Sequence, residues 1–120
     1  MGAYTMTFPS TMPLLNQNDR LHWAVKNKKV QEIKGISTTL ARSQGIPLLE
    51  RVEIESIYHP RDRRRRDCDN LSPTVKAIID GLVGAGVLPD DNSRYVEAIT
   101  YRIFPLPTKN PYLLLIIRPT

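Results

Sequence analysis

One stretch is central to the fold prediction: Ser72-Pro73-Thr74-Val75-Lys76-Ala77-Ile78-Ile79-Asp80-Gly81-Leu82-Val83-Gly84. Its apolar residues recur at the spacings expected for one buried face of an amphipathic helix: Val75, Ile78, Ile79, Leu82 and Val83. Ser72 is expected to be the N-cap, with Pro73 at the first helical position. The glycines Gly84 and Gly86 are expected to end the helix. The pattern therefore predicts a helix that packs one face against a core.

A second helix and four strands are expected on either side of this stretch. Residues 26–44 predict a helix with one face formed by Val30, Ile33, Ser37, Leu40 and Ala41, ended by Gly45 and Pro47. Residues 3–8, 51–59 and 95–104 alternate apolar and polar side chains, as strands do. Residues 112–118 form a continuous apolar run, which predicts a strand buried on both faces or covered by a partner.

The predicted element order is strand–helix–strand–helix–strand–strand, and the last two strands are expected to be able to form a hairpin. This order indicates an α/β fold, with a small mixed sheet of about four strands and two main helices packed on it. The length of 120 residues fits a single domain spanning residues 1–120.

The composition restricts the classes of partner. Hydrophobic residues make up 41% of the chain, enough for a core, and the net charge of +5 favours an anionic partner such as nucleic acid. No apolar run reaches the roughly 18 residues of a membrane span, and a membrane partner is not expected. The single cysteine excludes an intrachain disulfide and fits a reducing, cytoplasmic setting.

The sequence Arg63-Arg64-Arg65-Arg66-Asp67-Cys68-Asp69-Asn70 is the strongest candidate for a functional site. If the backbone is extended here, Asp67 and Asp69 point the same way, roughly 6–7 Å apart, while Cys68 points the other way and packs inward. Two such carboxylates can share Mg²⁺, which prefers oxygen ligands. The arginines would attract a polyanion to the same place and contact its phosphates.

Other polar groups have both an ordinary and a functional interpretation. Asp90-Asp91-Asn92 is a common turn or cap sequence, and Lys76 with Asp80 can be a surface ion pair or part of the acidic site. The polar residues 16–23 favour turn and N-cap chemistry over contact with phosphate. His22 is not expected to bind zinc, because no second His or Cys is suitably spaced. The lysines of residues 26–34 favour a solvated helix face over DNA contact.

Residues 58–96 resemble the RusA family of Holliday junction resolvases. The resemblance rests on Asp67-x-Asp69-Asn70, on Lys76 four residues before Asp80 in Lys76-Ala77-Ile78-Ile79-Asp80-Gly81-Leu82, on Gly86-Val87 and on Asp90-Asp91. The segment between Asn70 and Lys76 is longer here than in short members of that family. Each piece is weak alone, but together and at these spacings they are specific.

The resemblance implies a homodimeric endonuclease that depends on Mg²⁺, which Mn²⁺ can replace, and that resolves four-way DNA junctions by paired symmetric nicks. It implies that Asp67, Asp69 and Asp91 bind the metal and that Lys76 is the essential lysine of the reaction. The groups expected around these residues are Asn70, Asp80 and Asp90. The arginines Arg63, Arg64, Arg65 and Arg66 are expected to bind DNA.

Two alternatives stay open at this point. One is a phage or prophage nuclease that cuts other branched DNA, such as flaps, with the same residues. The other is a basic DNA-binding module without catalysis, in which the acids form ion pairs with the arginines. The distance in sequence between Asp69 and Asp91 weighs against a purely local ion-pair network.

Overall fold

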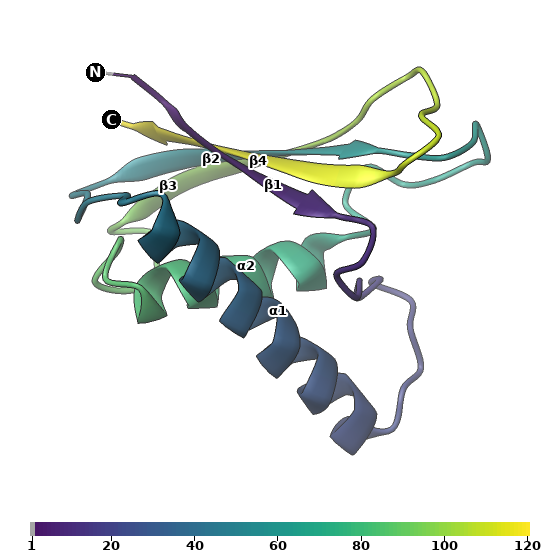
Figure 1. Ribbon diagram of the computed structural model, residues 1–120, viewed down its shortest axis with the longest axis horizontal. Helices are drawn as coiled ribbons and strands as arrows, with labels where there is room; N and C mark the ends of the chain where they lie inside the picture. The colour runs from purple at the N-terminus through teal and green to yellow at the C-terminus, as the bar shows by residue number, and fades with distance from the viewer. Residues whose placement is uncertain (1) are drawn as a thin grey trace.

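The computed structural model describes residues 2–120 as a four-stranded sheet with both helices on one of its faces (Figure 1). The α/β fold with a small mixed sheet and two main helices is confirmed. The elements in chain order are β1 (Tyr4–Pro9), α1 (Trp23–Ser43), β2 (Val52–His59), α2 (Ser72–Gly84), β3 (Val96–Ile103) and β4 (Tyr112–Pro119).

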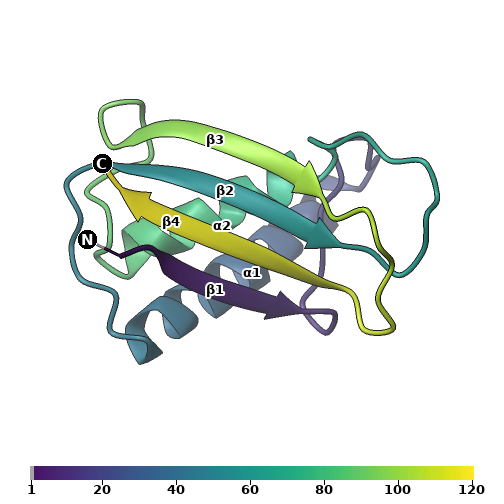
Figure 2. The same ribbon diagram turned by 90° about the horizontal axis from the view of Figure 1, so that it is seen from above.

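The strand order is β1-β4-β2-β3, so the predicted hairpin of the last two strands is wrong (Figure 2). β3 pairs with β2 in parallel, and β4 lies on the other side of β2, antiparallel to both β2 and β1. The physical reason lies in residues 104–111, where three prolines replace the tight turn that a two-stranded hairpin needs. This longer connection carries the chain past the end of β2 to the far side of that strand.

The hydrophobic core lies between the sheet and the helices. On β4 the side chains of Leu113, Leu115 and Ile117 are buried, and Leu113 and Leu115 lie opposite Phe8 and Met6 of β1. Burying each such side chain contributes roughly 1.5–3 kcal/mol. The alternate residues of β4 are half-buried on the sheet face that carries no helix. The apolar run of residues 112–118 is therefore a central strand with only one face in the core.

The two helices cross at Gly81. The Ser37 hydroxyl donates to the Ile78 carbonyl at 2.7 Å, and the Thr38 hydroxyl donates to the Gly81 carbonyl at 2.9 Å. A Cβ at position 81 would lie 2.6 Å from both the Lys34 carbonyl oxygen and the Ser37 Cβ. Glycine is needed here because the backbones of α1 and α2 approach too closely for any side chain.

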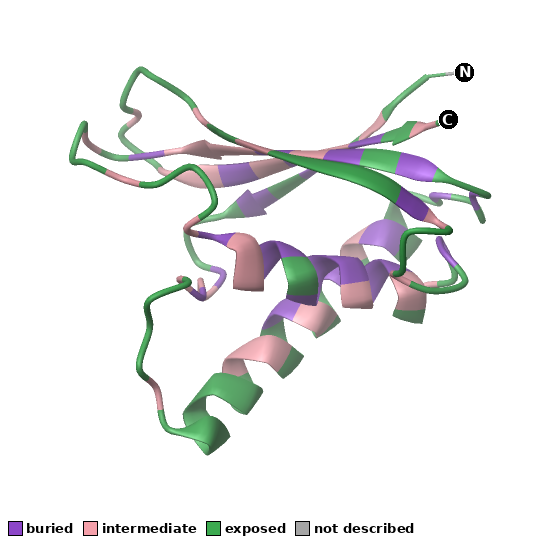
Figure 3. Cartoon of the chain, turned by 180° about the vertical axis from the view of Figure 1, so that it is seen from behind, coloured by how far each residue is buried: buried purple, intermediate pink, exposed green. Residues whose placement is uncertain are grey.

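The predicted helix starts need two corrections. α1 begins at Trp23, three residues earlier than predicted, because the Nδ1 atom of His22 accepts the Ala24 N–H at 3.2 Å and caps the helix. Ser72 is the first residue of α2 rather than its N-cap; Leu71 holds the N-cap position and makes no side-chain cap hydrogen bond. Figure 3 shows that the first turns of α1 extend beyond the sheet and are exposed. No helix within residues 2–120 is long and apolar enough to cross a membrane.

Candidate functional site

Lys76 on α2 lies between two carboxylates. Its ammonium group forms an ion pair with Asp91 and a second ion pair with Asp80 at 3.6 Å. The hydrogen bond from Lys76 is the main cause that lowers the pKa of Asp91, and the same bond raises the pKa of Lys76. Asp91 is therefore held as a carboxylate and Lys76 as an ammonium ion. The structure contains the surface ion pair of Lys76 and Asp80, and it adds Asp91 as a second partner of Lys76.

A hollow of about 350 Å³ opens beside this cluster, between the start of α2 and β3. We call it the lysine–aspartate pocket; its lining residues are Ser72, Pro73, Lys76, Ile79, Asp91, Ile99 and Tyr101. The lysine projects from the outer side of α2, and its side chain is 64% exposed. The opposite side of the same helix is packed in the core. The pocket thus combines an exposed cation with a less exposed carboxylate at a surface that an external ligand can reach.

The segment that carries Asp67 and Asp69 is turned rather than extended. The Asn70 N–H donates to the Asp67 carbonyl at 3.1 Å, and the Ser72 N–H donates to the Asp69 carbonyl at 2.9 Å. These bonds close two consecutive turns, so the expectation that both carboxylates share one face of a strand is wrong. Cys68 is exposed, so the expectation that it packs inward is also wrong. The chain must turn here to enter α2, and an exposed turn leaves Cys68 without a core to enter.

The structure brings Asp69 and Asp91 to the same region, but it does not gather three acids. The Ser72 N–H donates to the Asp69 carbonyl at 2.9 Å, and Ser72 lines the lysine–aspartate pocket, so Asp69 lies near that pocket. Burial and then the charge of Asp69 raise the pKa of Tyr101, another lining residue. Within residues 2–120, no three His, Cys, Asp or Glu side chains form a group that could hold a metal ion. Asp69 and Asp91 are hard oxygen donors that suit Mg²⁺ in chemistry. Asp67 is exposed in the adjoining turn.

The acids and amides around Asp91 hold its loop in shape. Asp90 accepts the Asp91 N–H at 2.8 Å and the Asn92 side-chain amide at 3.1 Å. The Asn92 side chain in turn accepts the Arg94 N–H at 2.9 Å. The turn interpretation of Asp90-Asp91-Asn92 is therefore right for Asp90 and Asn92. Asp91 differs from them, because its carboxylate points to Lys76.

The four arginines have different surroundings. Arg66 is pinned by the Asp62 carboxylate at 2.8 Å and by the carbonyls of Asp62 and Arg64, and its side chain is 15% exposed. Arg64 reaches Asp62 at 3.6 Å but stays 74% exposed. The N–H of Arg64 and the guanidinium of Arg66 lower the pKa of Asp62. Arg63 and Arg65 are exposed and make no ion pair within residues 2–120. Arg64 and Arg65 are thus available to a ligand, whereas Arg66 holds the loop.

Several contacts of this region were not predicted from the sequence pattern. The Thr74 hydroxyl is buried and bonds both the N–H and the carbonyl of Leu15 at 2.7 Å. The Asn70 amide donates to Asn16 at 2.9 Å, and the Gln17 N–H donates to the Asn70 carbonyl at 2.7 Å. These bonds fasten the loop after β1 to the segment before α2. Thr74 was expected to be an ordinary residue of the first helical turn, and nothing in the sequence indicates that its hydroxyl anchors the loop.

Fold and site together define a small α/β protein with a lysine–aspartate pocket next to an arginine-rich loop. No family model matches the chain. It is similar to a protein of Xylella fastidiosa (strain Temecula1 / ATCC 700964) that is described as an uncharacterized protein, with 29% identity over 102 residues. The matched region covers 81% of this chain and 64% of that protein, so the chain spans less than two thirds of its relative's length.

Proposed function

We propose that this protein is a Mg²⁺-dependent, structure-specific DNA endonuclease of the RusA type that resolves four-way junctions by paired nicks. The observation that carries the proposal is the cluster of Lys76, Asp91 and Asp80 in an open pocket close to Asp69. Clusters of charged groups with shifted pKa values at a pocket are typical of catalytic sites. The adjoining exposed arginines supply the affinity for DNA that such an enzyme needs.

The roles of the residues follow from their chemistry. Asp67, Asp69 and Asp91 would hold the Mg²⁺ ion, which when bound supplies activation of water and charge stabilisation at the phosphate. Asp91 is a carboxylate at neutral pH, and its hydrogen bond from Lys76 lowers its pKa further. Lys76 is long and exposed, so its ammonium group can turn from Asp91 to a phosphate oxygen and stabilise the charge that develops there. Asp80 lies 3.6 Å from Lys76 and would keep it oriented.

A homodimer is part of the proposal. A four-way junction has approximate two-fold symmetry, and two equivalent cuts need two equivalent sites, whereas this chain carries one lysine–aspartate pocket. The uncovered sheet face offers half-buried apolar side chains for such contact, among them Ile57, Leu114 and Ile116. Sedimentation at micromolar concentration should give twice the monomer mass, and a monomer alone would count against this part.

The test is a nicking assay with a four-way junction and a linear duplex of the same sequences. Nicks are expected in the junction, at symmetric positions, in Mg²⁺ or Mn²⁺ but not in EDTA. A flap substrate is added for comparison, and equal cutting of flaps and junctions would instead favour the alternative of a nuclease for other branched DNA. The assay separates junction resolution from general nuclease activity, because both substrates carry the same sequence and number of phosphates.

A second candidate function is DNA binding without catalysis. One observation favours it: Lys76 already neutralises Asp91 and Asp80, and no three-acid group is assembled within residues 2–120. This alternative predicts that the junction is bound equally in Mg²⁺ and in EDTA and is never nicked. The same assay, run with a binding measurement on the same samples, distinguishes the two functions.

A further inference from the structure

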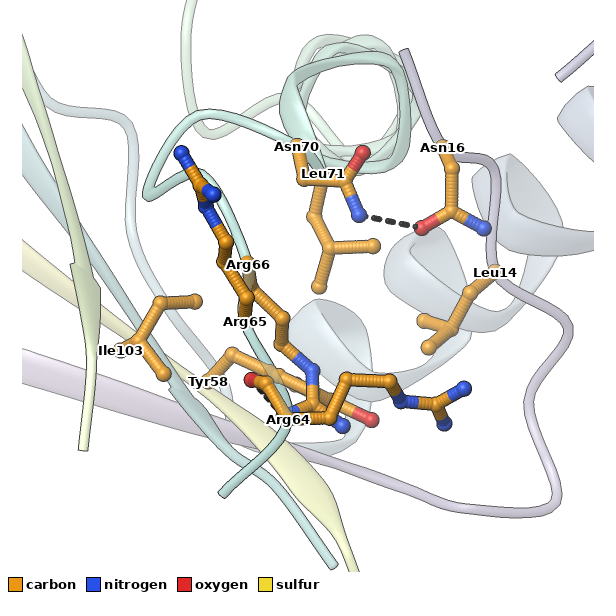
Figure 4. A pocket seen from close by; sticks show the side chains of 9 residues that line it. All are labelled: Leu14, Asn16, Tyr58, Arg64, Arg65, Arg66, Asn70, Leu71 and Ile103. Atoms are coloured by element: carbon orange, nitrogen blue, oxygen red, sulfur yellow. Dashed lines mark hydrogen bonds between the residues drawn. The ribbon is translucent and has the colours of Figure 1, made fainter. Parts of the chain in front are cut away.

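A second hollow of about 370 Å³ lies at the other end of the segment that precedes α2. We call it the arginine pocket; its lining residues are Leu14, Asn16, Tyr58, Arg64, Arg65, Arg66, Asn70, Leu71 and Ile103. Figure 4 shows the bonded Asn16–Asn70 pair on one side of it and Arg64 with Tyr58 on the other. Leu14 and Ile103 lie on opposite sides of Leu71 in this view. The volume falls in the range of sites for small organic ligands.

The arginine pocket has two kinds of wall. Arg64 and Arg65 are exposed guanidinium groups, and Arg66 is fixed beside them by Asp62. The rest of the lining combines the apolar side chains of Leu14, Leu71 and Ile103 with its single aromatic ring, that of Tyr58, and the amides of Asn16 and Asn70 bond each other at one side. A phosphate alone needs only the cationic wall. A ligand that also uses the apolar wall must carry a flat or apolar group next to its negative charge.

We propose that the arginine pocket binds one unpaired nucleotide, with its base against Tyr58 and the apolar wall and its phosphate on Arg64 and Arg65. The inference deepens the proposed function, on which it rests for the identity of the DNA. Stacking on an aromatic ring beside cationic groups is a common way to hold single-stranded nucleic acid. It tolerates any base, because every base has an aromatic face.

The arginine pocket and the lysine–aspartate pocket lie close enough together for one DNA strand to contact both. Ile99 and Tyr101 of β3 line the lysine–aspartate pocket, and Ile103 lines the arginine pocket. Residues two apart on a strand share a face and are about 6.6 Å apart. Likewise Asn70 and Leu71 border one pocket, and Ser72 and Pro73 border the other. A DNA strand with one phosphate at Lys76 would thus place the base of a neighbouring nucleotide in the arginine pocket.

A base inside a duplex is stacked and paired, so it cannot enter a hollow without leaving its partner. Unstacking costs least where pairing is already interrupted, as it is at the branch point of a junction. The arginine pocket would therefore favour branched over linear DNA through the base it holds. This mechanism adds selectivity for structure without any reading of sequence.

The test uses two probes of equal length and charge, measured in EDTA so that no cutting is required. One is a short single-stranded thymidylate oligonucleotide, and the other is a chain of abasic deoxyribose phosphates. The protein should bind the thymidylate probe roughly 5- to 100-fold more tightly, which corresponds to the loss of one stacked base. Replacing Tyr58 by leucine (Tyr58→Leu) should reduce that ratio toward one. Equal affinity of the unaltered protein for both probes would overturn the inference.

The matched control is Tyr4→Leu. Tyr4 is a half-buried tyrosine of β1 at the other end of the sheet from Tyr58 and outside the arginine pocket, and its replacement should leave the ratio unchanged. If Tyr4→Leu lowers the ratio as much as Tyr58→Leu does, the base is held elsewhere and the inference fails. If Tyr58→Leu does not fold, the two probes with the unaltered protein still decide. If junctions are nicked but both probes bind equally, the proposed function stands and only this inference fails. If the thymidylate probe binds more tightly but junctions are not nicked, the pocket for the base stands and the proposed function fails.

Discussion

The inner and outer faces of α2 differ in almost every property. The inner face carries Thr74, Ile78 and Gly81, all buried and with every polar contact satisfied inside the protein. The outer face carries Lys76 and Asp80, which are charged and reach solvent. One helix thus separates the residues that fix the fold from those that can meet a ligand. We expect substitutions on the inner face to change stability and those on the outer face to change activity.

The largest effect expected on the outer side is on cutting. Asp91→Asn removes one charge at nearly constant shape and should slow junction nicking by about a thousandfold, because a metal ligand supplies several kcal/mol to the transition state. Asp69→Asn should act in the same way. DNA affinity in EDTA should stay equal or rise, since a carboxylate repels phosphate. Rate, affinity and melting temperature are measured on the same samples.

The matched control for these variants is Glu50→Gln, which alters an exposed carboxylate away from both pockets. It should nick at the normal rate. Asp91 and Asp69 variants that nick as fast as this control would exclude these residues from the reaction. If cutting is lost only in proportion to the loss of folded protein, these residues act on stability, and the expected difference between the two faces of α2 is wrong.

The largest effect expected on the inner face is on folding. Gly81→Ala should lower the free energy of unfolding by about 3 kcal/mol, because the added methyl group would meet backbone and side chain of α1 at 2.6 Å. Gly35→Ala is the control: Gly35 lies in α1 with open space around it, and alanine there should raise stability by about 1 kcal/mol. Urea unfolding measures both. Similar values for both variants would contradict the close crossing at Gly81.

Thr74→Val should cost roughly 2 kcal/mol, because it leaves the buried N–H and carbonyl of Leu15 without their partner. Thr74→Ser keeps the hydroxyl and should lose much less. Thr39→Val, at an exposed position of α1, should be nearly neutral. Thermal unfolding that ranks Thr74→Val with Thr39→Val would show that the loop after β1 does not depend on this anchor.

A smaller effect is expected from the exposed arginines. Replacing both Arg64 and Arg65 by alanine should make the DNA association constant less sensitive to salt. The slope of its logarithm against the logarithm of the salt concentration should become smaller in magnitude by about two, at roughly 0.9 per phosphate contact. Arg42→Ala, near the C-terminal end of α1, is the control and should leave the slope unchanged. Fluorescence anisotropy over a salt series measures the slope. An unchanged slope in the double variant would move the DNA contact elsewhere, most directly to Lys26, Lys28 and Lys29.

The smallest effect concerns the stability supplied by the ion pair of Lys76 and Asp91. The pKa of Asp91 is lowered in the folded protein, so its contribution is present above the ordinary value of 3.8 and is lost as the pH falls through the folded value. Because Lys76 is well exposed, that contribution should stay below about 1 kcal/mol. Melting curves of the unaltered protein and Asp91→Asn should therefore nearly coincide at neutral pH and converge fully in acid. A large difference at neutral pH would make Asp91 a structural residue.

The sequence predicted the elements better than their arrangement. Helical spacing in residues 72–84 and alternation in residues 51–59 are local signals, and both elements form where predicted. The insertion of β4 between β1 and β2 depends on contacts between distant residues, which local patterns do not encode. Cys68 was misplaced because alternation was assumed in a segment that turns. The proximity of Lys76, Asp80 and Asp91 was foreseeable only in part, since Asp80 is one helical turn away whereas Asp91 returns through the loop after α2.

The place of β4 in the sheet has a consequence for synthesis on the ribosome. β1 emerges first, but its described sheet partner is β4, which follows it by about a hundred residues. Until β4 arrives, the backbone N–H and carbonyl groups along one edge of β1 have no strand to pair with, and neither have those along the facing edge of β2. Unpaired edges of this kind promote misassembly and association with chaperones. The nascent chain should therefore stay open to proteases until β4 has emerged and inserted between β1 and β2.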